Sequence, residues 1–148
     1  MRATIGLLAC LCIVAADDKQ KDLAKKDIAQ LQGEWTMVSG ERDGQALPEN
    51  IVSSAKRIVK DDEITLIIND QTYLKAKFKI DPTKKPKTID YTITEGQNKD
   101  AKQVGIYELS GDNVKFCFSS PGGKDRPTDF TTKEGSDRIL SVWKRNVK

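Results

Sequence analysis

The chain has 148 residues, which fits one domain rather than two. Its charge is nearly balanced, with 25 lysines and arginines against 22 acidic residues, and this argues against a dedicated nucleic-acid binder, which would carry a strong basic excess. The chain contains no histidine, so that Ser-His-Asp and Cys-His catalysis and histidine-ligated metal sites are excluded. No phosphate-binding, dinucleotide-binding or calcium-loop pattern occurs either, and we predict no metal and no cofactor.

The first sixteen residues have the pattern of a secretory signal. Arg2 precedes an uncharged, mostly apolar run that ends at Ala16, and Asp17 opens a polar segment. The run is shorter than the roughly 20 residues that a transmembrane helix needs. We therefore predict cleavage near Ala16, no transmembrane segment, and a secreted or periplasmic protein. The alternative is cleavage just before Cys10, which would leave a lipid anchor on that residue.

Two kinds of periodicity follow the signal. Residues 17–30 repeat apolar side chains at three- and four-residue spacing, which predicts a short amphipathic helix. Residues 31–148 form the predicted β domain, in which apolar and polar residues alternate. The predicted strands cover residues 35–39, 56–60, 63–69, 72–80, 88–94, 103–109, 114–119 and 138–145, with a weaker candidate at 128–132. Residues 51–55 fit either a short helix or an irregular crossing.

The fold class predicted from this pattern is all-β. Short strands separated by turn signals are typical of an antiparallel barrel or sandwich, and closure into a barrel of about eight strands removes the exposed edges. A single helix precedes this barrel. The side chains expected to line its interior are Met37, Leu66, Phe78, Tyr91, Ile106, Phe116 and Phe118. Because a one-residue slip exchanges the two faces of a strand, this set depends on the register.

Carboxylate pairs and the thiol offer little chemistry. Asp61 and Asp62 fall in a predicted hairpin turn, and Asp90 shares a strand face with threonines, so we interpret all three as surface residues. With the signal removed, Cys117 is the only cysteine left, and no intramolecular disulfide can form. We interpret Cys117 as a partly buried structural residue and predict that the protein is not an enzyme.

Lysines are concentrated on one strand and in the loop after it. They could attract an acidic glycan or an anionic lipid head group, although solubilising surface lysine gives the same pattern. The lysines concerned are Lys75, Lys77, Lys79, Lys84, Lys85 and Lys87.

Trp35 is expected to plug one end of the barrel. An arginine of the last strand can stack on its indole ring, and Arg145 is the first candidate, with Arg138 second. Gly33 is placed to end the preceding helix. The alternative interpretation gives Trp35 a contact with a ligand.

Long segments of the chain resemble a known family. They are residues 31–44 (LQGEWTMVSGERDG), 47–48, 81–90 (DPTKKPKTID) and 105–109 (GIYEL). These motifs are similar to those of the uncharacterised lipocalin-like domain abundant in planctomycete bacteria, over about residues 25 to 146. The resemblance implies a secreted or envelope-associated β-barrel and carries no known activity. A more distant resemblance to lipocalins of the calycin type rests on Gly33, Trp35 and the terminal arginine. It suggests binding of an apolar ligand only by analogy with other proteins of that fold.

Two functions follow as hypotheses. In the first, the domain carries a small, hydrophobic molecule inside the barrel. In the second, the barrel is filled by its own side chains and the domain is a structural or interaction module of the bacterial envelope, with a protein or glycan partner. The two differ in the volume left inside the barrel.

Overall fold

The computed structural model describes residues 9–147, with side chains from Asp17 onward. These residues form two helices, α1 (Ala9–Leu31) and α2 (Glu49–Ser54), and nine strands. The strands are β1 (Gly33–Arg42), β2 (Gln45–Ala46), β3 (Lys56–Lys60), β4 (Glu63–Ile68), β5 (Gln71–Asp81), β6 (Lys87–Gly96), β7 (Lys102–Ser110), β8 (Asn113–Ser119) and β9 (Arg138–Arg145).

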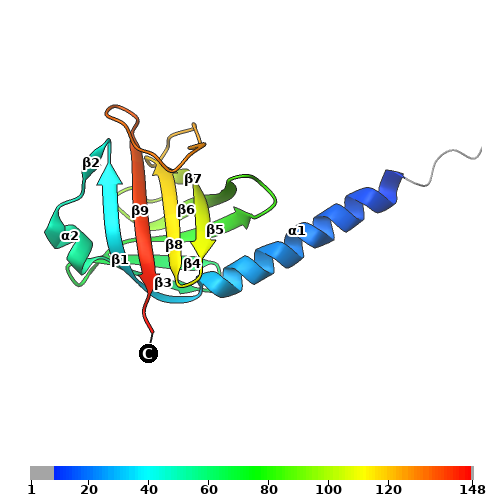
Figure 1. Cartoon of the computed structure of the whole chain (residues 1–148), viewed down its shortest axis with the longest axis horizontal. Coiled ribbons are helices and arrows are strands. Elements are labelled where there is room, and N and C mark those ends of the chain that lie inside the picture. The colour runs from blue at the N-terminus through cyan, green and yellow to red at the C-terminus, as the bar shows by residue number, and fades with distance from the viewer. Residues whose placement is uncertain (1–8, 148) are drawn as a thin grey trace, which may run out of the picture.

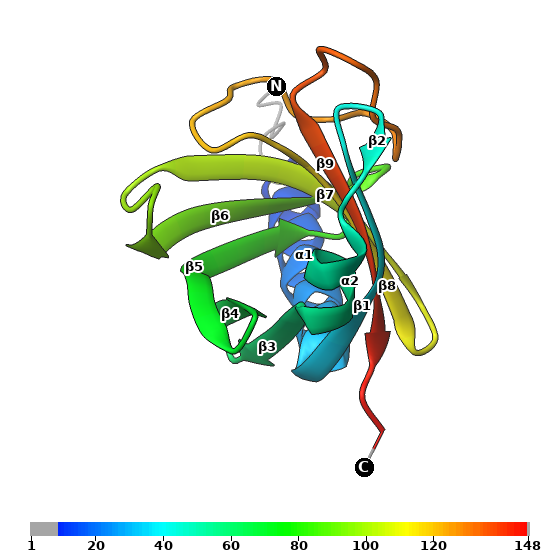
Figure 2. The ribbon, with the colours of Figure 1, turned by 90° about the vertical axis from the view of Figure 1, so that its left-hand side faces the viewer.

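The strands form one closed antiparallel barrel (Figures 1 and 2). Neighbours in sequence pair from β3 to β9, and β1 pairs with both β3 and β9, which closes a barrel of eight strands. The short β2 pairs only with the end of β1. In the closing pair Trp35 lies opposite Arg145, and Met37 lies opposite Trp143. The predicted fold class, an all-β barrel of about eight strands behind an N-terminal helix, is confirmed.

The segment 120–137 differs from the prediction. The weak candidate strand at 128–132 is wrong, because these residues lie in a long loop rather than in the sheet. The loop is bound to the outer surface of the barrel: the Arg126 guanidinium donates to the carbonyl oxygen of Gly105 over 2.8 Å, and the Cys117 thiol lies 3.9 Å from the carbonyl oxygen of Thr131. These contacts hold the loop against β7 and β8 without strand pairing.

The two helices lie on opposite sides of the barrel. α1 projects away from the strands at its N-terminal end (Figure 1), and its last turns place Ile28 and Leu31 against the barrel core. In Figure 2, α2 lies in front of the barrel and α1 behind it. α2 shows that residues 51–55 are mostly helical rather than an irregular crossing.

α1 is longer than the predicted helix. It begins at Ala9 instead of Asp17 and ends at Leu31, two residues before Gly33, whose φ is +108°. The predicted cleavage position at Ala16 falls within α1, and residues 1–8 of the predicted signal lie outside the described residues. Within the described part of the chain, neither helix combines the length and the apolar character that a membrane span requires.

Candidate functional site

The interior wall of the barrel contains most of the predicted lining residues. Met37, Phe78, Tyr91, Phe116 and Phe118 are buried in the interior cluster, and Leu66 is half-buried against it. They come from five different strands, and alternation within each strand turns every second side chain inward. Aromatic rings dominate one side, where the centroids of Tyr91 and Phe118 lie 4.4 Å apart.

The prediction for Ile106 is wrong. Its side chain is 1% exposed, but it is buried on the outer face of β7, where it lies opposite Cys117 of β8. Tyr107 lies opposite Phe116 and takes the inward position. The reason is that β7 is covered on both faces, by the barrel interior on one side and by the 120–137 loop on the other. Its apolar residues therefore do not alternate with polar ones, and the pattern does not reveal the register.

One end of the barrel is closed by Trp35, Gly33 and Arg145 together. Trp35 is 0% exposed, and its indole Nε1 donates a hydrogen bond of 3.0 Å to the carbonyl oxygen of Leu31 at the end of α1. The Arg145 guanidinium carbon lies 4.3 Å from the centroid of the Trp35 ring, and Arg145 Nη1 donates to the carbonyl oxygen of Gln32 over 2.8 Å. The arginine at Trp35 is thus Arg145. Arg138, the second candidate, instead pairs with Asp129.

Asp27 of α1 is a buried charge that the sequence analysis missed. It is 6% exposed, and its Oδ2 accepts hydrogen bonds from Lys87 Nζ at 2.8 Å and from the Tyr107 hydroxyl at 2.7 Å. Burial, followed by the hydrogen bond to Asp27 and its negative charge, raises the pKa of Tyr107 well above its usual value. These contacts fix α1 to β6 and β7, so this end of the barrel is held by polar contacts as well as by packing.

The opposite end of the barrel is covered more loosely. α2 buries none of its own side chains completely, and Val52 of α2 is only half-buried against the core. Leu47, just before α2, is also half-buried there. Below them, Leu66 of β4 lies opposite Leu74 of β5, and both are half-buried inward residues. Apolar side chains of the interior are therefore partly accessible at the α2 end.

Arg57 is the other charge inside the barrel that the sequence analysis missed. It lies on β3, opposite Trp35 on one side and Leu66 on the other, and it is 4% exposed. Its guanidinium carbon lies 4.2 Å from the centroid of the Phe116 ring and 4.8 Å from that of Trp143. The sequence signal was the alternation of residues 56–60, which places Arg57 on the same face as the buried Val59.

The space left beside Arg57 is small. A cavity of about 10 Å³ is bounded by this arginine and by apolar and aromatic side chains, and a volume of this size holds about one water molecule. Its lining residues are Leu31, Arg57, Val59, Ile64, Phe78, Ile89, Tyr91 and Phe116. In this part of the described interior, side chains fill most of the barrel.

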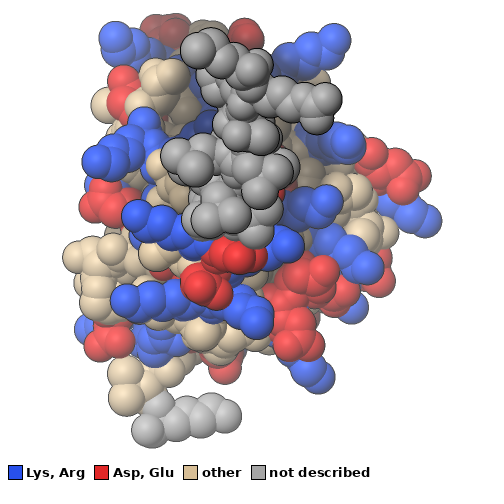
Figure 3. Space-filling view, turned by 90° about the vertical axis from the view of Figure 1, so that its right-hand side faces the viewer, with Lys and Arg blue, Asp and Glu red and all other residues tan. Residues whose placement is uncertain are grey.

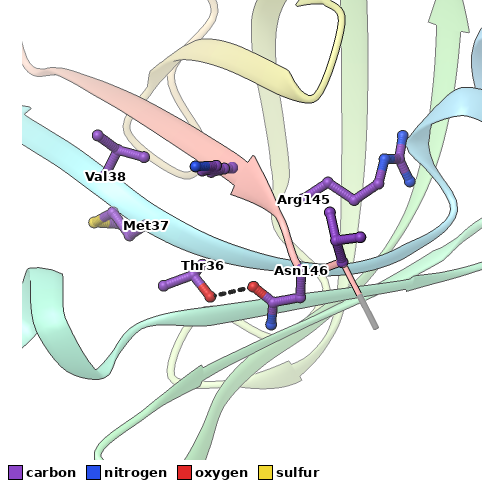
Figure 4. A pocket seen from close by; sticks show the side chains of 7 residues that line it. Thr36, Met37, Val38, Arg145 and Asn146 are labelled. Atoms are coloured by element: carbon purple, nitrogen blue, oxygen red, sulfur yellow. Dashed lines mark hydrogen bonds between the residues drawn. The ribbon is translucent and has the colours of Figure 1, made fainter.

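Larger hollows lie on the outer surface. One of about 460 Å³ runs along β1 and the C-terminal end of β9, where Thr36 donates a hydrogen bond of 2.5 Å to the side-chain oxygen of Asn146 (Figure 4). A second, of about 260 Å³, lies between the lysine-rich loop 82–87 and Phe130. Both are open to solvent. Neither leads into the cavity beside Arg57, since the two linings share no residue with it.

The predicted lysine cluster does not form a uniformly basic surface. Lys87 is paired with Asp27, and Lys75 lies 3.8 Å from Glu95. Lys84 and Lys85 line the second outer hollow. Figure 3 shows lysine and arginine side chains spread over the side from which α1 projects, with acidic side chains between them.

The remaining candidate residues lie apart from the barrel interior. Asp61 and Asp62 are exposed at the turn between β3 and β4, and the exposed Asp90 pairs with Arg126 at 2.7 Å. Cys117 is buried on the outer face of β8, and burial raises the pKa of its thiol. Across the part of the chain that the structure describes, no group of three or more acidic, cysteine or histidine residues is placed to hold a metal ion.

The fold defines the class of protein as a small antiparallel β-barrel domain. Its closed eight-stranded architecture is compatible with the lipocalin or calycin fold. Comparison with protein-family models, with curated proteins and with solved structures finds no match.

Proposed function

We propose that this domain is an exported, lipocalin-like binding protein whose barrel takes one small, largely apolar molecule through its α2 end. The observation that carries the proposal is the difference between the two ends. The α1 end is held by the Trp35, Arg145 and Asp27 contacts, whereas α2 covers apolar interior side chains without burying its own. A ligand entering here would displace half-buried side chains such as Val52 and Leu66 rather than break a polar network. The proposal gives the domain no catalytic activity.

Native mass spectrometry of the protein isolated from its own cells tests this proposal. We expect a discrete additional mass of a few hundred daltons that is lost on denaturation, and we expect the emptied protein to bind added fatty acids or fatty alcohols. Leu66→Trp narrows the α2 end and should weaken this binding. Leu109→Trp is the matched control, because Leu109 is half-buried against the core on β7 near the α1 end. Equal loss of binding in both variants would contradict entry at the α2 end.

The second candidate function is that of an envelope interaction module with a filled barrel and a protein or glycan partner. The observation that favours it is the cavity of about 10 Å³ beside Arg57, which is far smaller than a typical ligand pocket of roughly 300 Å³ or more. A bare polypeptide mass from cells, together with no binding of added fatty acids or alcohols, would support this candidate and refute the carrier.

The proposal includes export. Cleavage near Ala16 would release a secreted or periplasmic protein that begins at Asp17, whereas cleavage before Cys10 would leave a lipid-anchored protein. Intact-mass measurement of the exported protein distinguishes the two. A first residue of Asp17 supports the soluble form, and a diacylated Cys10 would replace it with the anchored form.

A further inference from the structure

Arg57 is a buried cation whose polar contacts are incomplete. Its Nη1 donates a hydrogen bond to the Tyr91 hydroxyl, and its Nε has no hydrogen-bond partner among the described residues. The side chain is 4% exposed, so that bulk water does not replace the missing partner. Unsatisfied buried donors are rare, and each needs a physical reason.

No negative charge in the described side chains balances Arg57. The five ion pairs within residues 17–147 do not include it, and the buried carboxylate of Asp27 is already bound to Lys87 and Tyr107. The Phe116 and Trp143 rings offset part of the cost of burying the cation. A buried charge ordinarily requires a counter-ion as well. Arg57 is therefore placed to bind an anion from outside the protein.

The cavity defines what kind of group can reach Arg57. Arg57 and Tyr91 are the polar residues in its lining, and Leu31, Val59 and Ile64 are among the apolar ones. Its volume of about 10 Å³ holds about one water molecule, so a ligand group contacts Arg57 only when neighbouring side chains move. A carboxylate matches the guanidinium fork and can also accept a hydrogen bond from the tyrosine hydroxyl. The apolar wall would contact the rest of the molecule.

We propose that Arg57 and Tyr91 bind the carboxylate of the barrel's ligand, so that the ligand class is an apolar monocarboxylic acid. This inference rests on the proposed function, because it names the ligand of that same barrel. The acid group lies at Arg57, and the apolar chain runs toward the half-buried side chains of the α2 end. Arg57 thus selects acids over neutral molecules of the same length.

Isothermal titration calorimetry of the full chain with octanoate and with 1-octanol tests the inference. We expect octanoate to bind more tightly than the alcohol. Arg57→Met keeps an apolar side chain of similar length but removes the charge, and it should weaken octanoate binding by about 10- to 100-fold, the usual effect of a charge-assisted hydrogen bond. It should leave 1-octanol binding within about threefold of wild type. Arg138→Met is the matched control, because Arg138 pairs with Asp129 at the surface, and it should change neither affinity.

Tyr91→Phe provides a second variant that keeps the ring and removes only the hydroxyl. It should weaken octanoate binding by about five- to tenfold and leave octanol unchanged. It keeps the test valid if Arg57→Met fails to fold. Chemical denaturation of the ligand-free protein adds a readout of a different kind. Loss of a buried, unbalanced cation should leave the unfolding midpoint of Arg57→Met equal to or above that of wild type.

The outcomes separate this inference from the proposed function. Equal affinities for octanoate and octanol, unchanged in Arg57→Met, would overturn the role of Arg57 and leave a barrel that binds apolar molecules. A lower unfolding midpoint in Arg57→Met with unchanged octanoate affinity would make Arg57 a packing residue and overturn the inference in the same way. Absence of binding by both probes, with a bare protein in native mass spectrometry, would refute the proposed function and this inference together.

Discussion

Replacement of Trp35 by alanine tests the closed α1 end of the barrel. The indole is fully buried, and the substitution removes most of the side chain from a packed interior. Buried tryptophan-to-alanine changes cost about 3–5 kcal/mol, from lost burial and from the cavity that remains. Here the change also leaves the carbonyl oxygen of Leu31 without its indole donor, and it removes the ring from under Arg145. We expect a total loss near the upper end of that range, because these contacts add about 1–2 kcal/mol of their own.

Urea denaturation followed by circular dichroism measures this loss without depending on the removed fluorophore. With a denaturant dependence of about 2 kcal/mol per molar urea, a loss of about 5 kcal/mol lowers the midpoint by about 2.5 M. Trp35→Phe is the graded control, since it keeps an aromatic ring for Arg145 and loses only the N–H and part of the volume. It should lose less than half as much. A loss below about 1 kcal/mol in Trp35→Ala would refute the plug.

Three further predictions concern other parts of the barrel. A methyl group added at Gly105 would lie 2.4 Å from a ring carbon of Phe118 and 2.8 Å from a backbone oxygen. Gly105→Ala should therefore lower the free energy of unfolding, measured in urea, by about 1–3 kcal/mol. An unchanged free energy of unfolding would contradict the close packing of β7 on β8. Because burial and Asp27 raise the pKa of Tyr107 in the folded protein, the unfolded chain loses this proton first. The contribution of Tyr107 to the free energy of unfolding is complete below about pH 10 and declines above it by about 1.4 kcal/mol per pH unit. Between about pH 9 and 11, the free energy of unfolding should therefore fall more steeply with pH in wild type than in Tyr107→Phe. The same pH dependence of unfolding in both proteins would contradict a raised pKa of the Tyr107 hydroxyl. The buried, high-pKa thiol of Cys117 should react with Ellman's reagent at pH 8 only after denaturant is added, and rapid reaction of the native protein would show that the 120–137 loop does not cover it.

The strand pattern was predictable where one face of a strand meets water. In β5, Ala76 and Phe78 are buried while Lys77 and Lys79 are exposed, and twofold alternation located both the strand and its inward face. Where both faces are covered, the same rule fails. Ile106 of β7 was assigned inward because nothing in its apolar surroundings distinguishes the two faces, and the loop that covers the outer one comes from residues far along the chain.

Local pattern indicates the inward position of Arg57, but it does not show the contacts that bury Arg57 and Asp27. Asp27 lies on a helix that is charged on most sides, and only the fold brings Lys87 and Tyr107 to its carboxylate. Arg57 stands between Lys56 and Ile58, and its burial follows from Phe116 and Trp143, which arrive on β8 and β9. By contrast, the contact of Arg145 with Trp35 was anticipated, because the first and last strands of a closed barrel must pair.

The pairing of β1 with β9 also determines when the domain can be completed during synthesis. β1 is synthesised well before its second partner, which occupies residues 138–145. Until those residues emerge, β1 and β8 both present free backbone edges, and such edges are prone to pair with other chains. Completion is therefore a late step, and it depends on contacts between residues more than one hundred positions apart, such as Gln32 with Arg145. A chain shortened by only its last strand would lose this closure and keep both reactive edges.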